Sequence, residues 1–421
     1  MPIDEQVAGF GVWGDSAPYS HRDSLYLVLV NVKTGIFHER FVFAAWSKRS
    51  TCDCGCKGRC TFDSVWAILC YSMQIELAGE WPSKRHDNTS FQSSGLPGDG
   101  RRARMAKNKI KIRGGVVESR GDWQYYKQAL GLQGWQNMPG ARVCFKCYAN
   151  SSTLPFTENG MDARWRSTLL THNGFAMEAL TNNLYISAIM NLPGFRYSYI
   201  SIDFMHCSCL GIVQILLGNV LYEIFRKMNG VNANPKRTIA DLLLLIHGAS
   251  RQLGQADVPI HSLTLNMLKV NGKSPKLKTK AAEGRHLLPC VLFLLRQYFK
   301  AENEYEHIRE LCVQYLSGIY DEFTMWTTRS ANKIAMGGRR HILLYEELAR
   351  HHRPTSCDQD WVFYRIYPKH HLFDHCVESF SGNLRESWCY PDESRIGECV
   401  KIGSSPNCKY LHRSVIIKDG L

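Results

Sequence analysis

The chain has 421 residues, of which 44% are hydrophobic and 21% are charged. This composition supports a sizeable core and excludes wholesale disorder. The length predicts two or three ordinary domains, or one domain with a large insertion. Lysine and arginine number 51 against 38 acidic residues, which gives a formal net charge of +13. Such an excess favours polyanionic partners through counterion release, and nucleic acid is the commonest of them.

Neither a membrane segment nor a secretory signal is predicted. Hydrophobic stretches over 212–225 and 287–299 are interrupted by polar residues such as Gln214 and Arg296. Neither stretch therefore has the roughly 20 apolar residues that a membrane helix requires. Met1 is followed by proline and acidic residues, not by the basic and then apolar pattern of a signal peptide. We expect no membrane partner and a reducing, intracellular location, with the nucleus as the compartment if the partner is DNA.

Short β-strands dominate the first part of the chain. Runs of β-branched and aromatic residues are separated by turn residues at 16–18 (Ser-Ala-Pro) and 33–35 (Lys-Thr-Gly), which predicts an antiparallel meander of three strands. Apolar residues at helical spacing then predict a helix, and a shorter strand and a helix lie on either side of Asp122. The predicted strands cover 7–14, 24–32, 37–46 and 116–120, and the predicted helices cover 62–77 and 123–130.

The later part of the chain is predicted to be mainly helical. A last strand over 197–202 leads into Asp203, and amphipathic patterns then continue for about 150 residues. This element order is that of an RNase H-like fold, so we predict an α/β protein with a mixed sheet and a large helical insertion before its last helix. The predicted divisions are 1–205 for the first part of the core, 206–366 for the helical insertion and 367–421 for the C-terminal part of the core.

Two basic segments are candidates for contact with nucleic acid. Residues 82–113 contain nine lysines and arginines opposed by Asp87 and Asp99, and a second basic segment covers 269–285. The first segment is predicted to be a solvated, mobile loop, and such a loop also suits a phosphate backbone.

Acidic residues occupy two places where metal-dependent chemistry on phosphodiesters needs them. Asp15 ends the first predicted strand, and Asp122 follows the strand over 116–120. A two-metal site requires about three carboxylates that converge on one point, because the cations neutralise their mutual repulsion. Each aspartate also has a simpler interpretation, since Asp15 suits a turn and Asp122 suits a helix N-cap.

Four stretches resemble DDE/D transposases of the CACTA (En/Spm) kind and related protist elements, along nearly the whole chain. They are VWGDSAPYSHRDSLYLVLVNV, RGDWQYYKQALGLQGW followed by CFKC, IDFMHCSCLGIVQILLGNVLYEI, and PKHHLFDHCVESFSGNLRESWCYPDES. The resemblance implies a third acid in the last stretch, where Glu393 matches best and Glu386, Asp392 and Glu398 are alternatives. It further implies that Asp15, Asp122 and Glu393 bind two Mg²⁺ or Mn²⁺ ions and catalyse DNA cleavage and 3′-OH strand transfer.

Cysteine and histidine residues predict zinc beside that site. Cys144 and Cys147 have the spacing of a zinc knuckle. Transib-like transposases and the related V(D)J recombinase complete such a site with an HxxxxH motif before the third acid. The resemblance therefore implies His370 and His375 as the other ligands, with His371 as an alternative to His370. The competing interpretation is that the cysteines are core thiols and the histidines are surface residues.

Two further groups of polar residues carry weaker predictions. Asp203 and His206 lie at i and i+3 on one helix face, and the resemblance implies a supporting role near the scissile phosphate; an N-cap aspartate and a packed histidine are the alternative. Four cysteines also cluster in a loop, and they form either a second zinc site or a turn with reduced thiols. They are Cys52, Cys54, Cys56 and Cys60.

The sequence thus predicts the catalytic domain of a transposon-derived DDE transposase with DNA as its partner, and homo-oligomerisation is left open. Two alternatives remain. The first is a catalytically inactive, zinc-stabilised, DNA-binding remnant of a transposase. The second is an RNase H-like nuclease that acts in repair or on RNA.

Overall fold

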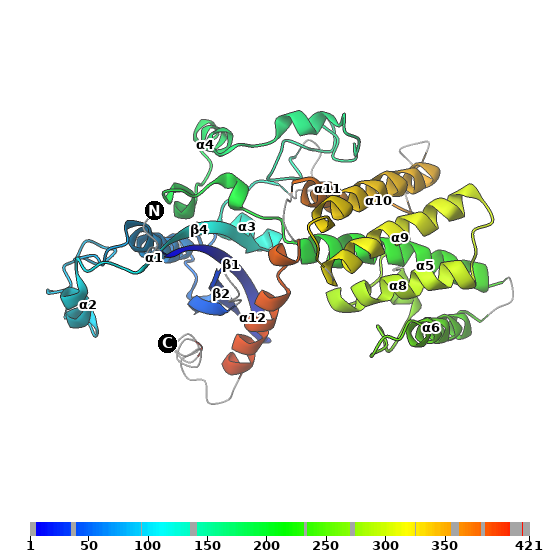
Figure 1. Ribbon diagram of the computed structural model, residues 1–421, viewed down its shortest axis with the longest axis horizontal. Helices are drawn as coiled ribbons and strands as arrows, with labels where there is room; N and C mark the ends of the chain where they lie inside the picture. Colours follow the sequence, from blue (N-terminus) through cyan, green and yellow to red (C-terminus); the bar gives the residue numbers. More distant parts are fainter. Residues whose placement is uncertain are drawn as a thin grey trace. The chain divides into compact units, whose positions relative to one another are not determined.

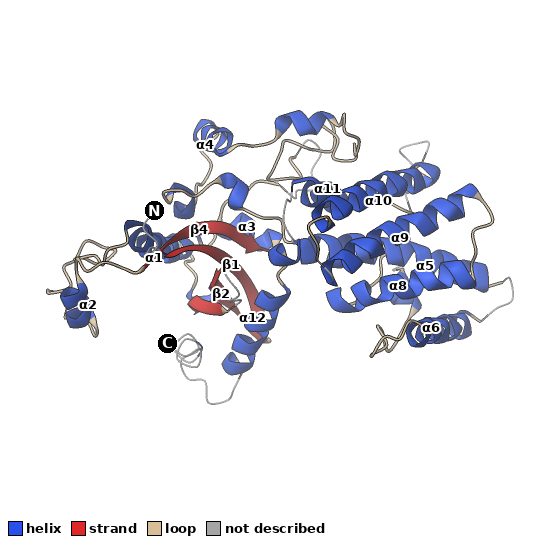
Figure 2. Ribbon diagram, viewed as in Figure 1, coloured by secondary structure: helices blue, strands red, loops and turns tan. Residues whose placement is uncertain are grey.

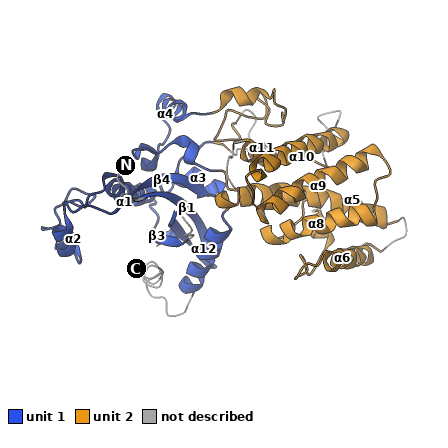
Figure 3. Cartoon of the chain, viewed as in Figure 1, with its two compact units in different colours: residues 1–133, 170–201, 389–421 blue, residues 134–169, 202–388 orange. Residues whose placement is uncertain are grey.

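The computed structural model describes residues 6–34, 39–93, 95–134, 141–230, 234–269, 274–324, 326–354, 362–379, 384–404 and 415. The chain divides into two compact units (Figure 3). The sheet unit contains residues 1–133, 170–201 and 389–421, and the helical unit contains residues 134–169 and 202–388. The units change at 201/202 and 388/389 instead of the predicted 205/206 and 366/367, and 134–169 joins the helical unit.

The sheet unit is built on a four-stranded mixed sheet with the order β3-β2-β1-β4 (Figure 2). β1 pairs antiparallel with β2, and β2 pairs antiparallel with β3. β4 pairs with β1 in parallel. The prediction of a mixed α/β protein that begins with a three-stranded meander is therefore confirmed. The strands are β1 (Gln6–Ser20), β2 (Asp23–Val32), β3 (Arg40–Ser47) and β4 (Ile112–Gly121).

Three details of the predicted strands differ from the structure. The turn predicted at 16–18 lies inside β1, where Pro18 pairs with Ser24. Beyond Gly14, the described pairing of β1 is with β2 alone, so the missing N–H of proline is tolerated on that open side. The strand predicted over 197–202 is a 3-10 turn (Tyr197–Tyr199) followed by one parallel bridge between Ile200 and Ser119. The predicted start of the third strand, residue 37, lies outside the described residues.

Helices cover the two faces of the sheet (Figure 1). On one face, α1 (Arg59–Ala78) packs beside α3 (Trp123–Ala129), and Trp66 Nε1 donates a hydrogen bond to the carbonyl of Ala129 at 2.9 Å. On the other face, α12 (Tyr390–Gly403) packs along β1 and β2. The helices predicted over 62–77 and 123–130 are thus present, each within two or three residues of its predicted ends. The sheet unit also contains α4 (His172–Thr181).

The basic segment 82–113 is more ordered than the predicted mobile loop. It contains the helix α2 (Asp99–Met105) and leads into β4. The Asp99 side chain is buried, and its carboxylate accepts hydrogen bonds from Arg85 and Arg102, each at 2.8 Å. Two of the segment's cations therefore stabilise its own fold instead of facing solvent alone.

The helical unit is organised around one long apolar helix. The π-helical segment η5 (Met205–Val213) continues directly into α5 (Gln214–Met228). By length and composition these 24 residues could cross a membrane, contrary to the prediction from the sequence. However, 83% of their most apolar 18-residue stretch is buried inside the protein. The other helices of the unit are α6 (Pro235–Gln252), α7 (Leu265–Leu268), α8 (Ala281–Gln297), α9 (Glu304–Thr324), α10 (Ser330–His352) and α11 (Pro368–Ser379).

Candidate functional site

Asp15 and Asp122 lie at the same level of two neighbouring strands. Gly14 of β1 pairs in parallel with Gly121 of β4, and each aspartate is the next residue. Adjacent strands are about 4.8 Å apart, so the two aspartates lie side by side. Asp122 directly follows β4, whereas Asp15 pairs with Leu27 inside β1, so the expectation that Asp15 ends a strand or begins a turn is wrong. Burial raises the pKa of Tyr26, and the charges of Asp15 and Asp122 raise it further. Both carboxylates are thus close enough to the Tyr26 hydroxyl to raise its pKa, which agrees with their positions on neighbouring strands.

Gly14, inside β1, and Gly121, at the end of β4, allow α3 to approach the two strands closely. A Cβ atom on Gly14 would lie 2.1 Å from the Tyr125 ring, and one on Gly121 would lie 2.3 Å from it. Asp122 is the N-cap of α3, and its Oδ1 accepts a hydrogen bond from the Tyr125 amide at 2.6 Å. The predicted N-cap role of Asp122 is confirmed, and its second carboxylate oxygen takes no part in that bond.

The last helix runs alongside β1 in the same direction. Near its start, Trp13 Nε1 donates a hydrogen bond to the Cys389 thiol at 3.0 Å. Just beyond its end, the Ser404 hydroxyl donates to the Tyr19 carbonyl at 3.0 Å. The strand rises about 20 Å between its two contact points, and the helix rises about 22 Å between its own. The two elements therefore stay in register over their shared length.

This register brings Glu393 toward Asp15. Side chains alternate along a strand, so Asp15 points to the same face as Trp13, which is the face that α12 covers. Glu393 lies four residues after Cys389 and so shares its side of the helix. Asp15 lies two residues after Trp13 on the strand, a rise of about 7 Å. Glu393 lies four residues after Cys389 on the helix, a rise of about 6 Å. Both acids are half-buried.

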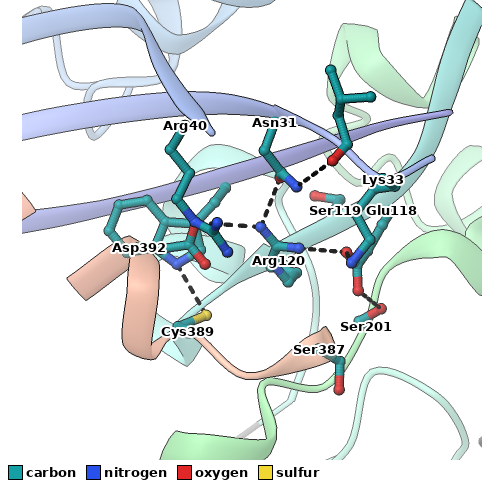
Figure 4. A network of polar contacts seen from close by, with 12 residues as sticks. Asn31, Lys33, Arg40, Glu118, Ser119, Arg120, Ser201, Ser387, Cys389 and Asp392 are labelled. Atoms are coloured by element: carbon teal, nitrogen blue, oxygen red, sulfur yellow. Dashed lines mark hydrogen bonds and ion pairs between the residues drawn. The ribbon is translucent and has the colours of Figure 1, made fainter. Parts of the chain in front are cut away.

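A buried network of charges holds the first turn of α12 on the sheet (Figure 4). The Arg120 side chain is fully buried. Its guanidinium donates to Glu118 at 2.6 Å, to Asn31 at 2.8 Å and to Asp392 at 3.3 Å. Asp392 is also fully buried and accepts from Arg40 at 2.9 Å. Burial alone would lower the pKa of Arg120, but the charges of Glu118 and Asp392 outweigh it and raise the pKa above its usual value.

The same contacts distinguish the alternatives for the third acid. Asp392 is buried between two arginines, so its charge is already neutralised. Glu398 is exposed and pairs with Arg395 at 2.6 Å. Glu386 belongs to the helical unit. Glu393 is therefore the acid of α12 that best combines partial burial with a position facing Asp15 of β1.

The three carboxylates do not form a compact metal site. Among the described residues, two groups bring three or more metal-ligand atoms within 4.8 Å of one another. Both groups consist of cysteine and histidine, and neither includes Asp15, Asp122 or Glu393. The structure therefore supports two sites for a thiolate-binding metal such as zinc, and it gives no preformed site for Mg²⁺ or Mn²⁺.

The first of these groups lies buried in the helical unit and combines Cys144, Cys147, His371 and His375. The Cys147 thiol is 3.2 Å from His371 Nε2 and 3.5 Å from His375 Nε2, and the two Nε2 atoms are 3.1 Å apart. Zinc bond lengths of about 2.0–2.3 Å at tetrahedral angles require ligand separations of about 3.3–3.8 Å. The donor atoms thus already approach the edges of a zinc tetrahedron. Four closed protein ligands are typical of a structural site.

The prediction of His370 as a ligand is wrong, and the alternative His371 takes that position. All three histidines lie on α11, where residues at i and i+4 share a face and residues at i and i+5 do not. His370 instead packs against the Tyr345 ring at 4.3 Å, and its Nδ1 accepts from the Tyr367 amide at 3.0 Å. The sequence signal that distinguishes His371 from His370 is its spacing of four residues from His375, which places both on one face of a helix.

An aromatic ring and a backbone amide surround this group, and the pKa values of its two thiols shift in opposite directions. Trp165 packs against His371 and His375, with ring centroids 4.4 and 4.9 Å apart. The Lys146 amide donates to the Cys144 sulfur at 3.2 Å. Burial alone would raise the pKa of Cys144, but the hydrogen bond from Cys147 and the nearby histidines bring it well below its usual value. The hydrogen bond with Cys144, together with burial, raises the pKa of Cys147, so the low pKa belongs to one thiol of the pair.

Asp203 and His206 form a local cap in the helical unit. Asp203 Oδ1 accepts from the Met205 amide at 3.0 Å, and its Oδ2 accepts from the His206 amide at 3.2 Å. Oδ2 also contacts His206 Nδ1. These bonds match the alternative of a capping aspartate and a packed histidine, because Asp203 lies two residues before the π-helical segment and accepts from amides in its first turn. A supporting role in catalysis stays a prediction.

We expect His371→Ala to remove about one equivalent of zinc per chain and to lower the melting temperature, because the imidazole is one of four ligands of a structural site. His370→Gln is the matched control, since it changes a neighbouring buried histidine outside the group. Metal content of the purified chain and thermal unfolding with and without a chelator test this expectation. Equal zinc loss in both variants would contradict the assignment of His371.

Arg120→Met should destabilise the protein by about 3–5 kcal/mol, because it leaves the buried Asp392 and Glu118 carboxylates without one of their cations. Arg113→Met, an exposed arginine of the same strand, should cost far less. Urea unfolding measures both. Adding Asp392→Asn to Arg120→Met should recover part of the loss, and a double variant as unstable as the sum of the singles would show that the pair is not coupled.

No family model matches the chain, and no curated protein matches it in sequence.

Proposed function

We propose that the sheet unit is an RNase H-like catalytic core that cleaves DNA and transfers strands in the manner of a DDE transposase. The observation that carries the proposal is the position of Asp15, within β1, beside Asp122, which directly follows the end of the parallel neighbour β4, with Glu393 on a helix in register with β1. The strand order β3-β2-β1-β4 supports it. So does the parallel bridge from β4 to Ile200, at the place of a fifth strand.

The proposed site separates two kinds of metal by ligand chemistry. Mg²⁺ and Mn²⁺ prefer oxygen ligands, whereas thiolate and imidazole ligands favour zinc. Asp15 and Asp122 would hold a divalent cation, and Glu393 would complete the site from α12. When bound, two such cations activate the nucleophile and stabilise the leaving oxygen. Arg120 keeps Asp392 out of this site by pairing with it.

Exposed cations of the sheet unit support DNA as the substrate. The side chains of Arg101, Arg104, Lys107, Lys109 and Lys111 are exposed on or just after α2. Contacts of this kind bind phosphates without reading sequence. The second basic segment supports the proposal less, because Lys269 covers the rings of Tyr222 and Phe363 and burial lowers the pKa of Lys276. Residue 273 of that segment lies outside the described residues.

A specific observation favours the second candidate function, a zinc-stabilised DNA-binding protein without catalysis. The cysteine and histidine ligands converge within 4.8 Å, and the three carboxylates do not. A chain that kept its structural metal and its basic surface would bind DNA in the same way. The two candidates differ only in whether the acids act.

The full chain should nick supercoiled plasmid DNA in Mn²⁺, and Asp15→Asn, Asp122→Asn and Glu393→Gln should each lower the rate about 100-fold or more, because a direct metal ligand is worth at least as much as an outer-shell partner. Glu398→Gln is the matched control on the same helix and should retain activity. A parallel assay on an RNA–DNA hybrid and on strand joining separates a transposase from a general nuclease.

Activity that survives Asp122→Asn would assign the nicking to a contaminant and contradict the proposed site. Loss of activity in Glu398→Gln but not in Glu393→Gln would move the third acid to Glu398. A folded, zinc-loaded chain that binds DNA in a salt-dependent way and never nicks it would establish the non-catalytic alternative.

A further inference from the structure

The four clustered cysteines between β3 and α1 converge on one point of the sheet unit. The sulfur atoms of Cys52, Cys54, Cys56 and Cys60 all lie within 4.8 Å of one another. The Cys54 and Cys60 sulfurs are 3.7 Å apart. In a zinc tetrathiolate, Zn–S bonds of about 2.3 Å give sulfur–sulfur separations of about 3.8 Å. The spacing of the thiols thus matches the edge of a metal tetrahedron.

The backbone of this loop is bent so that the thiols meet. Gly55, Lys57 and Gly58 have φ angles of +90°, +58° and +85°. This left-handed conformation is uncommon for a residue such as Lys57 and costs about 1 kcal/mol or more. The bend folds the loop over the first turn of α1, where the Cys60 amide donates to the Cys56 sulfur at 3.4 Å. Amide–sulfur bonds of this kind stabilise thiolates.

Hydrophobic burial does not hold this loop in place. Cys54 and Cys60 are exposed, and Cys52 and Cys56 are half-buried. Within 51–60, Gly58 alone is buried. Free cysteines are among the most buried residues of proteins, and the described cysteines outside this loop are buried or half-buried. Hydrogen bonds such as that from the Cys52 amide to Thr61 Oγ1 hold the loop, and a cross-link through the four thiols would stabilise it further without a core.

We propose that Cys52, Cys54, Cys56 and Cys60 bind one Zn²⁺ as a solvent-accessible tetrathiolate site, independent of the site at Cys144, Cys147, His371 and His375. Binding displaces a proton from each thiol, so the loaded site carries two net negative charges. It lies at the N-terminus of α1, where the helix dipole favours negative charge. The metal would clamp the loop after β3 to the first turn of α1.

The two sites differ in exposure, and this difference allows them to be measured separately. The full chain, purified under reducing conditions, should contain about two zinc ions. A colorimetric chelator should extract one of them from the native protein quickly, while the buried site of the helical unit releases its zinc only on unfolding. Cys54→Ser with Cys60→Ser should remove the fast equivalent, and His371→Ala should remove the slow one. Cys70→Ser, in the same helix as Cys60, is the matched control and should change neither.

A measurement on the unaltered chain covers the case in which the double serine variant fails to fold. Zinc should protect Cys52, Cys54, Cys56 and Cys60 from alkylation, and the chelator should expose all four together, as mass spectrometry of the peptides would show. Alkylation of these thiols at full zinc content would overturn the proposal. So would a fast equivalent that persists in Cys54→Ser with Cys60→Ser, the recovery of iron in place of zinc, or disulfide-linked pairs among the four.

Discussion

The buried guanidinium of Arg120 determines where the last helix of the sheet unit lies. It connects β4 to Asp392, which follows 272 residues later in the chain. Two buried charges that must meet tolerate far less displacement than two apolar surfaces do, because a slipped register would leave a carboxylate without a cation. The ion pair therefore selects one docking register for α12, although the chain passes through the whole helical unit between the two residues. The hydrogen bond from Trp13 to Cys389 is a second contact that is consistent with the same register of α12.

The face of β1 that α12 covers carries both the Arg120 network and Asp15. Gly11 of β1 leaves room for Asn31, since a Cβ atom there would lie 2.6 Å from the Asn31 Oδ1. Along β1, the face under α12 thus passes from Gly11 to Trp13 and then to Asp15. The network beneath contains three cations and two carboxylates, with Lys33 bound to Glu118 at 2.8 Å. On the proposed function, its excess positive charge would offset part of the repulsion among Asp15, Asp122 and Glu393.

Local patterns in the sequence were enough for the meander, for α1 and α3, and for Asp122 at the start of a helix. They failed where a distant contact decides the structure. The segment 197–202 has strand-like residues, yet Tyr197 stacks on Phe175 at 4.5 Å and a single bridge remains. His370 and His371 are adjacent, and only the helical phase of α11 separates ligand from core residue. The role of Arg120 had no local signal, because an arginine in a strand is usually exposed and its partner is remote.

The three carboxylates are not grouped, whereas the thiols and imidazoles are. This contrast is consistent with one chain that uses two kinds of metal. Zinc binds most ligand sets more strongly than Mg²⁺ or Mn²⁺ does, so a preformed cluster of three carboxylates would also attract zinc. Mg²⁺ keeps several waters and is commonly bound by one or two carboxylates together with phosphate oxygens of the substrate. On the proposed function, Asp15, Asp122 and Glu393 would then converge only when a DNA phosphate supplies the remaining oxygens. On the same proposal, the separation of the acids in the protein alone would protect the site from zinc, and the ion pair of Arg120 with Asp392 would keep α12 in register when the acids converge.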